Sequence, residues 1–217
     1  MGCLFNFIDL GANRGDNLVK FATNNMQRTL SALTVYDPPS NFCYYAFEPN
    51  PNFKSSLNVL RNKFKHFWKD DGGLYLHFEA AVPPKWPRMM TFRLDASPNS
   101  VGSTLIRTKH VNQMRGSIRV PTIDFIKWFD TYIPSNSTNI LKIDIEGAEY
   151  ELLSHLIISG HACKLKGLLF EWHSHKMKGH KFPPNIEENL IWMLKQCGVT
   201  LFSLTADEAE KHIPMRL

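Results

Sequence analysis

The feature that most constrains the fold is a short apolar run that leads into a glycine-rich turn and then into an amphipathic stretch. The apolar run covers residues 4–10, the turn runs from Gly11 to Gly15, and apolar side chains then recur at helical spacing from Leu18 to Leu30. A strand, a glycine turn and a helix build a ligand site by geometry, because backbone N–H groups at the helix start face the crevice beyond the strand. This pattern predicts an α/β protein with a binding site beside the turn.

The same alternation of apolar runs and helical patterns continues along the chain. It predicts further strands at residues 42–47, 74–82, 139–145, 167–172 and 199–204, and helices at residues 52–67, 123–129 and 185–197. Strands that alternate with helices indicate a doubly wound, mostly parallel sheet. The least regular stretch, about residues 85–117, is expected to be an insertion or lid. Residues 205–217 carry little pattern, which leaves open an incomplete sheet at the C-terminal edge.

Size and charge narrow the class of protein. At roughly 150 residues per domain, the 217 residues are expected to form one domain over residues 1–217. The 25 Lys and Arg residues exceed the 20 Asp and Glu residues by five, which permits an anionic partner without requiring one. The basic residues are interspersed and form no motif for stacking bases, so a nucleic-acid partner is not favoured. No apolar run approaches the ~18 residues of a membrane span.

The four cysteines, Cys3, Cys43, Cys163 and Cys197, are scattered along the chain. Their spacing matches no zinc motif, and a disulfide framework is not expected. The N-terminal residues also lack the pattern of a signal peptide. These observations predict reduced thiols and a cytoplasmic location.

Two acids beside the turn indicate which ligand the site takes. A dinucleotide site needs glycines at G-x-G-x-x-G, but here Asn13 stands at the second glycine position, and Asp9 is a poor neighbour for phosphate. S-adenosylmethionine carries a cationic sulfonium, an α-amino group and no phosphate. Its ribose diol suits an acid at the end of the second strand, where Glu48 stands. The alternative is that both acids are solvated groups at strand ends. The residues expected to bind the donor are Asp9, Gly11, Asn13, Gly15 and Glu48.

At this point the sequence resembles a known family, the FkbM-type methyltransferases. The resemblance lies in residues 7–16, 46–51, 120–124, 141–149 and 169–173, and the block Lys-Ile-Asp-Ile-Glu-Gly-Ala-Glu at 142–149 is its most specific part. It covers the chain from about residue 4 to residue 204. It implies a class I, Rossmann-like methyltransferase fold and methyl transfer from S-adenosylmethionine, usually to oxygen.

Candidates for the chemistry follow the fourth and fifth expected strands, which end beside the glycine turn. They are Asp144, Glu146, Glu171, His173 and His175. Asp144, Glu171 and His173 are the expected catalytic residues, with His173 as the base, because its ordinary pKa suits proton removal at neutral pH. A loop with ordinary surface histidines is the alternative. Glu146 could equally accept N–H groups at a helix start, and Glu149 is expected to be a solvated or helix-pairing acid.

Asp144 and Glu171 also offer paired carboxylates that could hold a magnesium-type ion. The sequence shows no third ligand, so a metal is not favoured. The leading hypothesis is O-methylation of a small-molecule or glycan-like acceptor. The alternatives are an RNA methyltransferase and a degenerate, non-catalytic binding module with the same fold.

Overall fold

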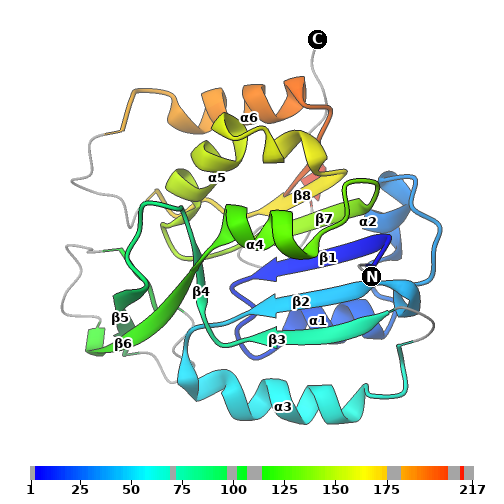
Figure 1. The fold of residues 1–217 in the computed structure, drawn as a ribbon, viewed down its shortest axis with the longest axis horizontal. Coiled ribbons are helices and arrows are strands. Elements are labelled where there is room, and N and C mark those ends of the chain that lie inside the picture. Colours follow the sequence, from blue (N-terminus) through cyan, green and yellow to red (C-terminus); the bar gives the residue numbers. More distant parts are fainter. Residues whose placement is uncertain are drawn as a thin grey trace.

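The computed structural model describes residues 3–68, 72–96, 102–106, 114–174, 182–204 and 211–212. Its main sheet contains β1 (Phe5–Leu10), β2 (Cys43–Phe47), β3 (Gly73–His77), β7 (Thr138–Ile143), β8 (Gly167–Phe170), β9 (Thr200–Ser203) and β10 (Lys211–His212). The strand order is β10-β9-β8-β7-β1-β2-β3, and every pairing is parallel except that of β10 with β9 (Figure 1). The mostly parallel α/β sheet predicted from the sequence is confirmed.

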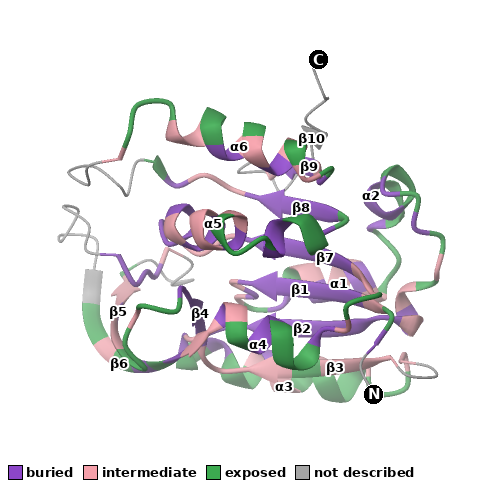
Figure 2. Ribbon diagram, turned by 45° about the horizontal axis from the view of Figure 1, so that its top comes forward, coloured by how far each residue is buried: buried purple, intermediate pink, exposed green. Residues whose placement is uncertain are grey.

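Within the described residues, six α-helices cover the two faces of this sheet. They are α1 (Asp16–Ala22), α2 (Gln27–Ala32), α3 (Lys54–Lys63), α4 (Phe125–Tyr132), α5 (Glu149–Ile158) and α6 (Ile186–Gln196). Adjacent strand residues point to opposite faces, so Phe7 packs with α1, α2 and α3, whereas Ile8 packs with α4, α5 and α6. In Figure 1, α4 lies in front of the sheet and α1 behind it. Figure 2 shows the central strands β1, β2, β7 and β8 as largely buried, as doubly wound packing requires, whereas β3 at the edge is only partly buried.

A second, smaller sheet stands beyond the carboxyl ends of the main strands (Figure 1). It contains β4 (Ala80–Val82), β5 (Met89–Asp95) and β6 (Met114–Asp124), in the order β4-β6-β5. The predicted third strand therefore splits, because β3 ends at His77 and β4 pairs with β6 instead. Within the stretch expected to be an insertion or lid, β5 pairs with β6 along seven residue pairs. Phe92 and Val120 bury against β4, which gives this sheet an apolar core.

The ends of other elements also differ from the sequence prediction. The helical pattern after Gly15 forms two helices, since α1 ends at Ala22 and α2 starts at Gln27. At the C-terminal edge of the main sheet, β10 adds an antiparallel strand next to β9. Among the residues that the structure describes, no helix has both the length and the apolar character needed to cross a membrane.

The cysteines are paired, which corrects the prediction of reduced thiols. Cys3 and Cys43 form a disulfide that joins the start of β1 to β2, with the two Cα atoms 5.8 Å apart. Cys163 and Cys197 form a second disulfide that joins the turn after α5 to the end of α6, with Cα atoms 4.5 Å apart. The sequence spacing gave no hint of either pair, because each bond depends on neighbouring strands or helices that bring distant residues together.

Candidate functional site

A cavity that opens to solvent lies at the carboxyl ends of β1, β2 and β7. Main-sheet residues, among them Gly11, Glu48 and Asp144, form one wall. Phe92 and Leu105 from the smaller sheet and its adjoining loop line the cavity as well. This is the crevice in which doubly wound sheets bind their ligands.

The glycine turn folds tightly against the ends of β2 and β7. The backbone N–H groups of Gly11 and Ala12 both donate to the Phe47 carbonyl, at 3.0 and 3.1 Å. Gly11 has a φ of +83°, and a Cβ at this position would lie 1.9 Å from the Asp144 carbonyl oxygen. Only glycine therefore allows β1 and β7 to approach so closely at this point.

Glu48 lies in the cavity wall with its carboxylate held by the backbone. The N–H of Asn13 donates to Oε2 and the N–H of Asn50 donates to Oε1, both at 2.7 Å. The residue is only 5% exposed. Burial raises the pKa of Glu48 to about 7, although the N–H groups of Asn50 and Asn13 and the charge of Lys142 oppose the shift. Each oxygen keeps a second lone pair for a ligand hydroxyl.

Asp9 does not line the cavity, contrary to the expectation that it meets the ligand directly. Its side chain is fully buried, accepts a hydrogen bond from the Tyr44 hydroxyl at 2.7 Å, and pairs with Lys142 Nζ at 3.2 Å. Gly15 is also turned away from the cavity, because a Cβ there would meet Leu60 of α3 at 2.4 Å. Both residues therefore shape the site through packing and charge.

Lys142 connects the glycine turn to the end of β7. Its Nζ donates to the Gly11 carbonyl at 2.7 Å and lies 3.2 Å from Asp9 and 3.3 Å from Asp144. Burial alone would lower the pKa of this lysine, but the charges of Asp9 and Asp144 outweigh burial and raise it. The ammonium group is thus a fixed positive charge beneath the cavity. Lys142 is not among the residues that the sequence predicts for the site, although a lysine between apolar residues of β7 is a signal of a buried ion pair.

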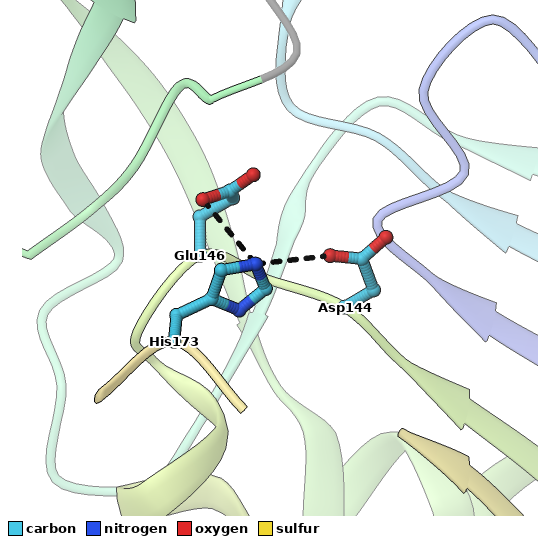
Figure 3. A group of neighbouring side chains, drawn as sticks. All are labelled: Asp144, Glu146 and His173. Atoms are coloured by element: carbon cyan, nitrogen blue, oxygen red, sulfur yellow. Dashed lines mark ion pairs between the residues drawn. The ribbon is translucent and has the colours of Figure 1, made fainter. Parts of the chain in front are cut away.

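Close to Lys142, four carboxylates surround the imidazole of His173. Figure 3 shows the side chains of Asp144 and Glu146 converging on Nε2 of this histidine. Asp144 lies 3.7 Å, Glu146 3.5 Å and Glu171 3.9 Å from Nε2. These residues follow β7 and β8, so the strand ends do bring together the three expected catalytic residues and Glu146.

Glu149 holds the other side of the imidazole. One of its oxygens lies 3.0 Å from His173 Nδ1 and accepts the His173 backbone N–H at 2.9 Å, while the other accepts the Gly147 N–H at 2.8 Å. Glu149 is fully buried, so the prediction of a solvated acid is wrong. It also makes the contact with the helix start that was considered for Glu146.

The surroundings in this cluster raise the pKa values of His173 and Glu171. Burial would lower the pKa of His173, but the hydrogen bond that its Nδ1–H donates to Glu149 and the charges of Glu149, Glu146 and Asp144 raise it to about 9. Burial and the charge of Asp144 raise the pKa of Glu171. His173 and Glu171 are not among the residues lining the cavity, whereas Asp144 and Glu146 are. His175 lies outside the described residues.

Comparison with known proteins gives one match. A model of the methyltransferase FkbM domain matches residues 9–200, which includes the glycine turn, Glu48 and the whole carboxylate cluster. Searches of curated proteins and of solved structures returned no match for the chain.

Proposed function

Because the chain belongs to the FkbM methyltransferase family, we propose that it moves the methyl group of S-adenosylmethionine to a hydroxyl oxygen of a small-molecule or glycan-like acceptor. The observation that carries this proposal is the placement of Glu48. Its carboxylate stands in the cavity wall at the end of β2, anchored by two backbone N–H groups beside the glycine turn. A ribose diol is a pair of donors that suits such a fixed acceptor.

On the donor side, Glu48 would accept the ribose hydroxyls, and the backbone from Gly11 to Asn13 would border the rest of the donor. Asp9 acts indirectly, because it fixes Lys142, which in turn holds the Gly11 carbonyl and Asp144. The negative charge of Asp144 and Glu146 at the cavity favours a cationic sulfonium over a phosphate ligand.

On the acceptor side, the hydroxyl oxygen would approach the methyl carbon near Asp144, which lines the cavity and belongs to the same cluster as Glu171 and His173. The carbon–sulfur bond breaks as the carbon–oxygen bond forms, and sulfur keeps the electron pair, which leaves S-adenosylhomocysteine. The hydroxyl proton passes to the carboxylate cluster. The protein's contribution is chiefly alignment, since the donor is already activated by its positive sulfur.

Donor binding tests this proposal. S-adenosylmethionine or S-adenosylhomocysteine should raise the melting temperature of the protein, because a ligand bound only to the folded chain stabilises it. Glu48→Ala should abolish the shift. Glu151→Gln is the matched control, since this carboxylate contacts Lys85 and Trp86 instead of the cavity. A folded chain that shows no shift with millimolar donor contradicts the proposal.

Release of S-adenosylhomocysteine over a panel of sugars and small alcohols tests the transfer itself. Donor binding without release on any acceptor would favour the degenerate binding module. Release that requires RNA, and that weakens steeply with salt, would favour the RNA methyltransferase instead.

A further inference from the structure

The carboxylate cluster around His173 has the composition and spacing of a metal site. Its possible ligand atoms are one oxygen each from Asp144 and Glu146 and one nitrogen of His173, and all lie within 4.8 Å of one another. Atoms held about 2.1 Å from a shared ion at tetrahedral angles lie about 3.4 Å apart. The 3.5 and 3.7 Å separations from Nε2 to Glu146 and Asp144 are close to that value and longer than hydrogen bonds.

The imidazole is oriented as a ligand by groups outside this set. Nδ1–H donates a hydrogen bond to Glu149, and Nε2 is the nitrogen that faces Asp144 and Glu146. A metal-binding histidine usually gives its other ring N–H to a carboxylate in this way. Glu149 is itself fixed by two backbone N–H groups, and its side chain is fully buried. The orientation of the ring is therefore built into the fold.

Charge at the cluster points the same way. Asp144, Glu146, Glu149 and Glu171 together carry four negative charges within 3.9 Å of one imidazole. A protonated His173 offsets one of them, and Lys142 pairs with Asp144 while it also pairs with Asp9. Among the residues that the structure describes, the group stays net negative with both cations counted, so a divalent cation would relieve repulsion among the carboxylates.

We propose that Asp144, Glu146 and His173 form a binding site for a divalent cation of the Mn²⁺ or Zn²⁺ class. This set differs from the Asp144 and Glu171 pair considered from the sequence, because Glu146 and His173 supply the ligands that the pair lacked. Two carboxylates and an imidazole suit these ions, whereas Mg²⁺ prefers sites in which every ligand atom is oxygen. The cation's use depends on the proposed function: at the cavity wall it would hold the acceptor hydroxyl oxygen and favour loss of its proton.

Titration with Mn²⁺, followed by the loss of the free-ion electron paramagnetic resonance signal, tests the site without donor or acceptor. The full chain should bind one Mn²⁺, and Zn²⁺ should compete for it. Asp144→Asn and Glu146→Gln should each weaken binding at least tenfold. Glu151→Gln should leave it unchanged, because this acid of α5 lies outside the cluster.

Parallel titration with S-adenosylhomocysteine separates this proposal from the function. A folded chain that binds S-adenosylhomocysteine but neither metal ion overturns the cation site and leaves the proposed function standing. In that case protonated His173 alone balances part of the negative charge of the carboxylates around it. Cation binding that persists in both cluster variants overturns the assignment of the ligands. Cation binding without S-adenosylhomocysteine binding supports the site and counts against the function alone.

Discussion

Lys142 shows how a single residue can unite two halves of a site. It is one of the largest fully buried side chains, and its ammonium group contacts the glycine turn, Asp9 and Asp144 together. A charge in this position is tolerated because oxygen atoms surround it. The turn that borders the cavity and the acid at the end of β7 therefore keep a fixed separation.

Replacement of this lysine should be costly. Lys142→Met leaves the buried Asp9 without its cation, so we expect the free energy of unfolding to fall by about 3–5 kcal/mol, as for other broken buried pairs. Urea denaturation measures the change. Asp9→Asn added to Lys142→Met should recover part of the loss, because the uncompensated carboxylate is removed. A loss below about 1 kcal/mol in the single variant would contradict the role assigned to the pair.

The raised pKa of Glu48 predicts a pH dependence of donor binding. The carboxylate form accepts both ribose hydroxyls, so affinity for S-adenosylhomocysteine should rise by about tenfold from pH 6 to pH 8, as Glu48 ionises near pH 7. Calorimetry at both pH values measures this rise. In Glu48→Gln the affinity should be weaker and nearly independent of pH. An equally steep profile in that variant would assign the titration to another group.

The contribution of Glu48 to the free energy of unfolding of the unliganded protein should fall as the pH rises, whereas donor affinity should increase. The folded pKa of Glu48, about 7, exceeds the ordinary value of 4.5, so the folded state binds this proton more tightly than the unfolded state. The stabilisation from Glu48 is complete below pH 4.5 and is lost as the pH rises through 7. Thermal unfolding of the wild type against Glu48→Gln isolates this contribution.

At the scale of elements, one threonine ties the smaller sheet to the carboxylate cluster. Thr104 Oγ1 donates to the Glu146 carbonyl and accepts the Ile106 N–H at 3.0 Å, and the residue is fully buried. Its backbone also bonds to Arg93 of β5 in both directions. The loop that carries Glu146 and the strand β5 are therefore held together through this residue.

Thr104→Val keeps the shape of the side chain and removes both hydroxyl bonds. The Glu146 carbonyl and the Ile106 N–H each lose their bond to this hydroxyl, so we expect a loss of about 1–3 kcal/mol in unfolding free energy. Thr131→Val is the control, because the Thr131 hydroxyl is exposed and bonds only to the Lys127 carbonyl in its own helix. Chemical denaturation should show little change there. Equal losses in the two variants would deny Thr104 a special role.

The sequence predicts the main-sheet strands because they are apolar runs between glycine turns and helical patterns. It fails for β6 because Gly116 and Pro121 interrupt that run, and such residues are signals of loop or edge structure. It finds Glu48 and Asp144 since both directly follow buried strands. It misses the inward turn of Glu149, because the start of a helix does not reveal which neighbour its acid will face.

At the scale of the whole molecule, the two disulfides join residues 40 and 34 positions apart in the sequence. Cross-links across such loops restrict the unfolded chain, so each is expected to contribute about 4 kcal/mol. Cys163→Ser with Cys197→Ser should lower the urea midpoint accordingly, and reductant should lower it further in this variant. The oxidised chain should be four hydrogen atoms lighter than the reduced chain by intact mass. Four free thiols in the denatured, unreduced protein would refute both bonds.

The cavity draws its two walls from different parts of the chain. The ends of β1, β2 and β7, which lie far apart in the sequence, supply one wall, whereas β4, β5 and the loop near Leu105 supply the other from one contiguous stretch. Because the second wall comes from one contiguous stretch, it can be replaced by another sequence without changing the strand ends that form the first wall. Under the proposed function, a graft of a foreign β5–β6 hairpin that retains Thr104 would redirect the enzyme to new hydroxyl compounds while its donor chemistry stays intact. Acceptor range could diversify during evolution by the same route.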